Sequence, residues 1–338
     1  MTALPSATPS PAQSSTLLPS GSAAALSCSL PVASGGGPAQ PAGFVSQPSG
    51  TFTPDATSLI SYDDSSARYR TAQAPVLYGD SGSPTYDGAY RRWLPVTAAQ
   101  VLPDGSAYVY TREANPTQFR NEIHIVSVTT GADRVIYNND AYHTLSYQTE
   151  GIYLYYHLNG TDGDHGLWLL NPTTQSLKAF PGGAPAWWAT VVGGGAWSNS
   201  VDGNRFGSTN FARLDLSTGV VTTWYSTPSQ AQPPEPGSKI VRAIGFDGSL
   251  HPLVEVWVIG GSPEVWLLSA PSHATRLNGL PLLDFIPSSL GVTDSHGTWV
   301  VGADGLYLYA GSSFRRVAAA PPFTGIVDGN YAIAGPCA

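Results

Sequence analysis

The loop from Asn159 to Gly166 carries the clearest metal-ligand pattern in the sequence. Asn159, Asp162 and Asp164 place three side-chain oxygens in one short loop, and hard oxygen ligands of this kind suit Ca²⁺. The loop is not an EF-hand, because no glutamate stands at the twelfth position and no helical pattern flanks it. A solvated hairpin loop explains the same residues. We therefore expect no cofactor unless calcium binds here.

Patterns of known catalytic sites are absent or incomplete. The sequence has no G-x-S-x-G nucleophile elbow, and its seven histidines lack metal-ligand spacing. Candidate acids for a paired-carboxylate hydrolase are Asp247, Glu255, Asp294 and Asp304, which fall on different turns and strands. The sequence thus favours a binding module without catalytic residues. A propeller glycosidase or lyase acting on an extracellular polysaccharide is the alternative.

Composition excludes two classes of protein. Charged residues make up 11% of the 338 positions, against about 25% in typical soluble proteins. The net charge of −8 argues against a nucleic-acid binder, which needs a basic stripe. No run approaches 18 consecutive apolar residues, so no transmembrane segment is expected. The expected partner is a protein or a carbohydrate, and we expect the chain to be a monomer.

The two cysteines, Cys28 and Cys337, lie near opposite ends of the chain. Two unrelated thiols are one interpretation, and a disulfide that joins the two ends is the other. We predict the disulfide, which favours an oxidising compartment and therefore an extracellular or cell-envelope location. Residues 1–42 are rich in Ser, Pro and Gly and contain no Lys or Arg. They predict a disordered linker and do not resemble a signal peptide.

Five segments of the chain share one pattern: an alternating apolar strand, a short polar turn and a second strand. They start at Glu122, Gly166, Phe211, Glu264 and Gly305. The pattern is typical of β-hairpins, and starts roughly 41–53 residues apart are typical of propeller blades. The residues before each hairpin supply two more strands. Each unit is therefore predicted to be a four-stranded antiparallel blade.

The ends of the chain are predicted to complete the ring. Five units cover about residues 97–319, Ser83–Val96 looks like two outer strands, and Phe323–Cys337 looks like two inner strands. Together these end segments make a sixth blade from both termini, which protects sheet edges. Gly43–Asp55 adds an outer strand or belongs to a seventh blade. We predict an all-β, six-bladed propeller over residues 43–338, with seven blades as the alternative.

One blade carries a recognisable motif. The segment Leu102–Thr111, "LPDGSAYVYT", resembles the S-P-D-G-x-x-I-A-F signature of TolB-like and WD40-like propeller repeats. Gly245–Leu250 and Gly302–Tyr309 keep the Asp-Gly pair without the proline. The resemblance implies a propeller closed by both termini. Such propellers serve as periplasmic scaffolds, as gating domains of peptidases and as sugar or protein binders, and no matching residue selects among these roles.

Insertions indicate where a ligand would bind. Arg112–Asn121, Ser200–Asn210 and Ser226–Lys239 are long for a repeat and are predicted to lie on one face of the ring. Trp187 and Trp188 are adjacent, so one should pack between blades while the other could face a loop surface. The ligand-binding candidates are Phe119, Arg120, Trp187, Trp188, Arg205 and Phe206.

Overall fold

The computed structural model describes most of the chain from Leu26 onward. The described ranges are 26–34, 39–40, 42–80, 83–115, 120–140, 142–157, 164–180, 187–200, 210–226, 239–258, 262–282, 290–323 and 331–338. The expected linker over residues 1–25 lies outside these ranges, as do the insertions of residues 116–119, 201–209 and 227–238.

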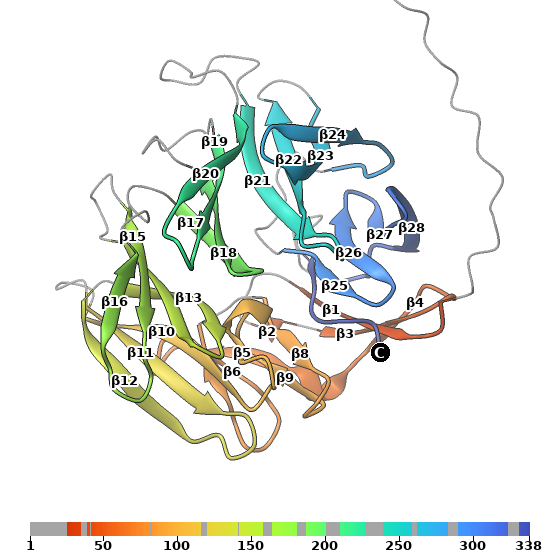
Figure 1. The fold of residues 1–338 in the computed structure, drawn as a ribbon. Coiled ribbons are helices and arrows are strands. Elements are labelled where there is room, and N and C mark those ends of the chain that lie inside the picture. The colour runs from red at the N-terminus through yellow and green to blue at the C-terminus, as the bar shows by residue number, and fades with distance from the viewer. Residues whose placement is uncertain are drawn as a thin grey trace, which may run out of the picture.

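Seven sheets of three or four strands form a ring around a common centre (Figure 1). Neighbouring sheets contact each other chiefly through the first or second strands of their order, as in the pairs β10–β13, β13–β17, β18–β21, β21–β26 and β26–β29. The first strand of each sheet therefore lies toward the centre, which is the arrangement of a β-propeller. The sheets are called blades 1 to 7 below.

The first three blades have the following strands. Blade 1 contains β2 (Ala39–Gln40), β5 (Ile60–Asp63), β6 (Arg68–Arg70) and β7 (Tyr78–Gly79). Blade 2 contains β10 (Ala107–Asn115), β11 (Arg120–Ser127) and β12 (Asp133–Asp140). Blade 3 contains β13 (Tyr142–Gln148), β14 (Gly151–His157), β15 (Asp164–Leu170) and β16 (Leu177–Phe180).

The other four blades have four strands each. Blade 4 contains β17 (Trp187–Val192), β18 (Gly195–Ser200), β19 (Asn210–Asp215) and β20 (Val221–Ser226). Blade 5 contains β21 (Lys239–Phe246), β22 (Pro252–Val258), β23 (Glu264–Ala270) and β24 (His273–Leu277). Blade 6 contains β25 (Val292–Asp294), β26 (Gly297–Gly302), β27 (Gly305–Ala310) and β28 (Ser313–Ala319). Blade 7 contains β29 (Tyr331–Ile333), β1 (Ser29–Ser34), β3 (Ala42–Ser46) and β4 (Thr51–Pro54).

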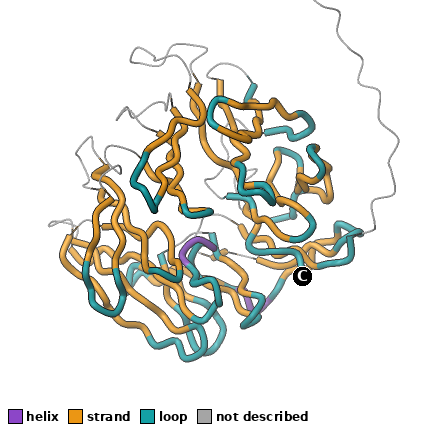
Figure 2. Tube along the Cα trace, in the orientation of Figure 1, coloured by secondary structure: helices purple, strands orange, loops and turns teal. Residues whose placement is uncertain are grey.

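Helix is nearly absent from the described residues (Figure 2). Only two short 3-10 turns occur there, η1 (Ala56–Ser58) and η2 (Ala98–Gln100). No helix of the described part is long and apolar enough to cross a membrane.

The core lies between the blades, because each blade buries both of its faces. In β14, Ile152 and Leu154 pack with Val109 of blade 2, whereas Tyr153 packs with Trp188 of blade 4. These side chains are at most 4% exposed. Burial on both faces explains why the inner strands read as continuous apolar runs with little polar alternation.

The ring has seven blades, so the six-bladed prediction is wrong and the seven-bladed alternative holds. Residues 42–54 supply β3 and β4 of blade 7, and residues 60–79 supply three strands of blade 1. The segment Ser83–Val96 forms a separate hairpin of β8 (Thr85–Asp87) and β9 (Arg92–Leu94) instead of the outer strands of the closing blade. Strands of two to four residues in blade 1 are too short for alternation to reveal.

Blade 7 closes the ring with strands from both ends of the chain. β29 pairs with β1 in the register Val32↔Ile333, and the Ser29 N–H donates to the Ala338 carbonyl at 2.8 Å. The propeller thus begins upstream of residue 43, at Ser29. β29 is the one strand described within the segment Phe323–Cys337, where the sequence predicted two.

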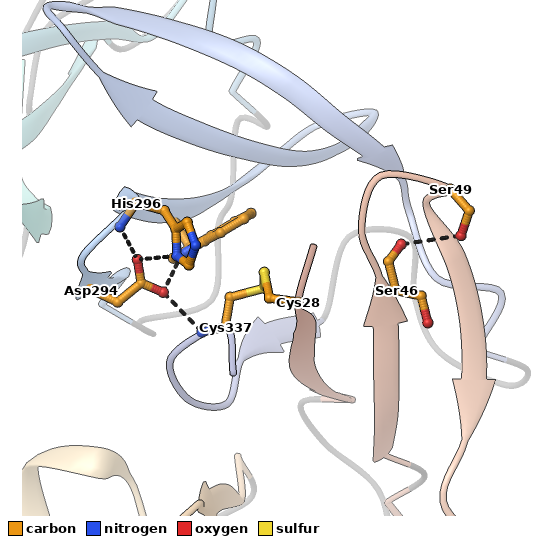
Figure 3. Close-up of a disulfide and its surroundings, with 7 residues drawn as sticks. Cys28, Ser46, Ser49, Asp294, His296 and Cys337 are labelled. Atoms are coloured by element: carbon orange, nitrogen blue, oxygen red, sulfur yellow. Dashed lines mark hydrogen bonds and ion pairs between the residues drawn. A yellow bond between two sulfur atoms is a disulfide. The ribbon is translucent and has the colours of Figure 1, made fainter. Parts of the chain in front are cut away.

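The predicted disulfide between Cys28 and Cys337 is confirmed, with Cα atoms 5.5 Å apart (Figure 3). Asp294 of blade 6 holds the same end of the chain. Its Oδ2 accepts hydrogen bonds from the Cys337 N–H at 2.9 Å and from the Trp299 indole N–H at 2.7 Å. Trp299 is fully buried. A covalent bond and a buried carboxylate therefore secure the closing blade together.

Candidate functional site

Blade 2 differs from the other blades at its inner edge. Where the sequence predicts an inner strand, the chain forms η2 and then a single β-bridge between Val101 and Tyr108. The Leu102 N–H donates to the Ala107 carbonyl at 2.9 Å. Beyond this short pairing, no strand of the described ranges pairs with the inner side of β10, because the sheet order is β10-β11-β12.

A side chain takes the place of the missing strand. Asp80, directly after β7, accepts the backbone N–H of Thr111 on its Oδ2 at 2.8 Å. The Gln100 side-chain amide donates to Asp80 Oδ1 at 3.2 Å and to Thr144 Oγ1 of β13 at 2.9 Å. The Thr144 N–H in turn donates to Thr111 Oγ1 at 2.8 Å. These four residues, Asp80, Gln100, Thr111 and Thr144, are called the Asp80 cluster.

The turn η2 holds the Gln100 side chain of the Asp80 cluster in place. Thr97 is the residue before η2, and its N–H and hydroxyl both donate to Gln100 Oε1 at 3.0 Å. This reciprocal capping arrangement fixes a glutamine at the third position of the turn. Gln100 is 6% exposed. Its amide N–H groups are therefore aimed at Asp80 and Thr144 before any ligand arrives.

Asp80 as a whole residue is exposed to solvent. The protein around its carboxyl group opposes ionisation and raises the pKa of Asp80 to about 6, although hydrogen bonds from Thr111 and Gln100 favour the ionised form. Among the described residues, no lysine or arginine forms an ion pair with Asp80. The carboxylate can therefore accept a hydrogen bond or a positive charge from a ligand.

A partly buried network of charged and aromatic side chains fixes the opposite face of β10. Asp133 Oδ2 accepts the Tyr110 hydroxyl at 2.7 Å and an N–H of Arg68 at 2.9 Å, while Asp133 Oδ1 lies 2.7 Å from His124 Nδ1. The other ring nitrogen of His124 lies 3.3 Å from Glu122. Burial opposes ionisation of Asp133, but the hydrogen bonds from His124 and Tyr110 outweigh it and lower its pKa.

Alternation along β10 separates the network from the Asp80 cluster. Tyr110 stacks on His124 with ring centroids 4.5 Å apart and packs in the core that blades 1 and 2 share. Thr111, the next residue, points the other way, toward Thr144 of blade 3. β10 is thus held on both faces, so its inner edge is a rigid platform.

Of the six predicted ligand-binding residues, the structure describes the side chains of two, Arg120 and Trp188. Arg120 is exposed and begins β11, opposite Asn115. Trp188 is 4% exposed and packs between blades, as expected for one of the tryptophan pair. Trp187 begins β17, and its side chain lies outside the described residues. Phe119, Arg205 and Phe206 also lie outside them, so their role stays a prediction.

Most of the predicted calcium loop also lies outside the described residues. Asn159 and Asp162 lie outside the described residues. Asp164 begins β15, where its backbone pairs with His157, and its side chain is not described. Within the ranges that the structure describes, no three His, Cys, Asp or Glu side chains gather to hold a metal ion. Calcium at residues 159–164 stays a prediction.

Sequence reasoning missed Asp80, because nothing nearby distinguishes it from other turn aspartates. Asp63, Asp104 and Asp215 each accept hydrogen bonds from a serine two residues ahead, which is the ordinary Asx turn. Asp80 instead accepts from Gln100 and Thr111, which are 20 and 31 residues away. Only the folded arrangement of blades 1, 2 and 3 brings these groups together.

No protein-family model matches the sequence, and no curated protein matches it. Solved structures with a similar fold include TolB from Acinetobacter baumannii, at 12% identity and a TM-score of 0.46, over 91% of this chain and 67% of that one. A protein from Lactobacillus plantarum has 12% identity and a TM-score of 0.49, over 87% of this chain and 97% of that one. The acylaminoacyl peptidase of Pyrococcus horikoshii gives 9% and 0.49, over 86% of this chain and 46% of that chain.

These neighbours are TolB and related β-propeller proteins, as the sequence motif implied. The fold assignment rests on the seven sheets of this chain. Nothing about activity is carried over from the neighbours.

Proposed function

We propose that the chain is an exported binding module that takes a protein or carbohydrate ligand at the Asp80 cluster, on the inner side of the propeller ring. One observation carries the proposal. Asp80 is an exposed carboxylate without a cationic partner among the described residues, and buried neighbours fix its orientation. A ligand that donates a hydrogen bond or brings a positive charge would complete its environment.

Preorganisation supports binding at this place. Gln100 is oriented by Thr97, and Thr111 lies on a strand that packs on both faces. Because these groups are already ordered, a ligand loses little affinity to the cost of ordering them. Ligands bind most often in concave sites, where several polar groups can surround one ligand. The inner side of a propeller ring is a concave surface of this kind.

Export is supported by the disulfide. A bond between Cys28 and Cys337 persists in oxidising compartments such as the cell envelope and the extracellular space. We therefore propose an envelope or extracellular location and a ligand found there. A monomer suffices for this proposal, because the Asp80 cluster is built within one chain.

The enzymatic alternative, a glycosidase or lyase, needs an acid that is free to reach the substrate. Asp294 is occupied by Trp299 and Cys337. Glu255 is fully buried against Arg242, and burial raises its pKa. These two acids stabilise the fold, so they are unavailable as the catalytic pair that such an enzyme needs.

The proposal can be tested with arrays of extracellular glycans and peptides, probed with the wild-type chain and the Asp80→Asn variant. Asparagine keeps an acceptor for the Thr111 N–H and removes the charge. We expect wild-type binding to a ligand class and a loss of about tenfold or more in affinity for Asp80→Asn. Asp63→Asn, an exposed turn aspartate, is the matched control and should bind like wild type.

Equal binding by wild type and Asp80→Asn would show that the Asp80 cluster is not the site. New reducing ends or unsaturated sugars in the polysaccharide samples would instead support the enzymatic alternative.

A further inference from the structure

The inner edge of β10 offers free backbone groups next to Asp80. The Ser106 carbonyl accepts the Val128 N–H, so it faces the β11 side of the strand. The Thr111 N–H donates to Asp80 and faces the opposite, inner edge. Backbone groups alternate between the two edges of an antiparallel strand, so the N–H and carbonyl groups of the odd-numbered residues of β10 face its inner edge. Apart from the Thr111 N–H, no hydrogen bond to the backbone of Thr111 or Glu113 occurs at this edge among the described residues.

An unpaired strand edge of this kind is a template for another strand. The groups without a hydrogen-bond partner among the described residues are the Thr111 carbonyl and the N–H and carbonyl of Glu113. Thr111 is half-buried and Glu113 is exposed, so both can be reached. The edge therefore fits an extended peptide segment, which would supply the innermost strand that blade 2 lacks.

Asp80 decides the direction of such a strand. An antiparallel strand would aim a carbonyl at the Thr111 N–H, where the Asp80 carboxylate already lies, so two acceptors would face each other. A parallel strand opposite Arg112 uses only the free groups. Its first residue donates its N–H to Thr111 and accepts the Glu113 N–H, and its third residue donates its N–H to the Glu113 carbonyl.

The first residue of that parallel strand places its nitrogen beside the Asp80 carboxylate. A free amino terminus carries a positive charge there, and Asp80 has no cationic partner among the described residues. The Glu113 side chain is exposed nearby, and the whole chain has a net charge of −8. Charge and backbone geometry thus select the same group.

We propose that β10 binds the free amino terminus of an extended peptide, which adds to blade 2 as a parallel inner strand with its ammonium group shared between Asp80 and the Thr111 carbonyl. This rests on the proposed function, and it specifies the ligand as a peptide end. The remaining residues of the peptide would follow β10 toward Asn115, the end of the strand.

The test uses the peptide Val-Thr-Val-Thr-Val as a probe, with binding to the full chain measured by calorimetry. Acetylation of its amino terminus should weaken binding about tenfold or more, because it removes the charge. N-methylation of the third residue should weaken it similarly, because that N–H donates to Glu113. N-methylation of the second residue, whose N–H points away from β10, is the matched control and should change little.

The Asp80→Asn variant should lose about tenfold in affinity for the free peptide and little for the acetylated one, whereas Asp63→Asn should match wild type for both. Hydrogen exchange should show that the Glu113 amide gains protection when the free peptide binds.

The inference is overturned if the free peptide does not bind at about 1 mM, or if acetylation or N-methylation of the third residue leaves its affinity unchanged. The proposed function stands in either case if the arrays reveal an Asp80-dependent ligand of another kind. If the arrays show no loss for Asp80→Asn while the peptide protects Glu113, the strand edge is a binding surface and the Asp80 site is not.

Discussion

In blades 2 and 7 the innermost strand does not come from the residues directly before the second strand. The two blades fill that place in opposite ways. In blade 7 the C-terminal strand β29 fills the place and pairs with β1. The disulfide and Asp294 then lock that end of the chain. In blade 2 the place holds the turn η2 and the side chain of Asp80, which pair with only part of β10.

The difference indicates a division of roles around the ring. Blade 7 has a paired inner strand, a covalent bond and buried hydrogen bonds, which are features of a stability element. Blade 2 has an exposed carboxylate and free backbone groups on a rigid strand. A folded chain tolerates such an incomplete edge most readily where something else binds it.

Removing the disulfide of blade 7 should have the largest effect on the free energy of unfolding. The bond closes a sequence separation of 309 residues, so the chain-entropy model gives an upper limit of about 6 kcal/mol. We expect Cys28→Ser/Cys337→Ser to lose about 3–5 kcal/mol in the free energy of unfolding, measured by urea titration. Reduced wild type should behave alike. Unchanged stability in both samples would mean that β29–β1 pairing alone closes the ring.

Removing the Asp294 carboxylate should have the next largest effect. In Asp294→Ala the buried Trp299 indole N–H and the Cys337 N–H lose their acceptor, which should cost about 2–3 kcal/mol. Asp304→Ala, where an exposed carboxylate pairs with Arg316 and accepts the Tyr307 hydroxyl at 2.8 Å, should cost less, about 1 kcal/mol.

The two locks of blade 7 should also be coupled. Because both hold the same end of the chain, Asp294→Ala should cost less in the Cys28→Ser/Cys337→Ser background than in wild type. Strict additivity of the two losses would contradict a shared closing element.

Loosening blade 2 should cost less. Thr144→Val keeps the β-branched shape and removes the hydroxyl that accepts the Gln100 amide, so we expect a loss of about 1 kcal/mol in the free energy of unfolding. Thr275→Val, on the exposed outer strand β24, should change stability by less than about 0.5 kcal/mol. Equal effects of the two substitutions would mean that the Asp80 cluster is not an ordered network.

Asp80 should show a small pH dependence. Burial raises its pKa in the folded chain to about 6, above the ordinary value of 3.8. The folded state therefore holds the proton more tightly than the unfolded state, and this contribution to stability is present at low pH and lost as pH rises from about 4 to about 6. The difference in unfolding free energy between wild type and Asp80→Asn should fall through that window.

Urea titrations at a series of pH values measure this difference directly. A difference that instead rises with pH, at pH values below about 4, would mean that the pKa of Asp80 is lowered, as for a carboxylate held by cations.

The sequence allowed the closure of blade 7 to be anticipated better than the inner edge of blade 2. The positions of Cys28 and Cys337 near opposite ends of the chain predicted the covalent closure. The hairpins of blades 2 to 6 were visible because their strands are long enough to show the repeating pattern. Blade 1 was missed because its strands are too short to show a period, and this cost the correct blade number.

The Asp80 cluster could not be predicted for a different reason. Its hydrogen bonds link residues that are 20, 31 and 44 positions apart. No local motif marks Asp80, Thr111 or Thr144, and the capping pattern at Thr97 and Gln100 marks only the turn η2. The motif Leu102–Thr111 did locate the turn before β10, with Gly105 at φ 73° as a Pro-Asp-Gly turn requires. It gave no sign that the preceding inner strand is reduced to η2.

Native-state hydrogen exchange of the unliganded chain tests the contrast between the two blades most directly. In β10, the Arg112 amide faces β11 and the neighbouring Glu113 amide faces the open edge. We expect Glu113 to exchange nearly as fast as an unprotected amide, while Arg112 and Ala33 of β1 exchange only through larger openings of the fold. If Glu113 is as strongly protected as Ala33, the inner edge of blade 2 is closed, and the account of an open binding edge is wrong.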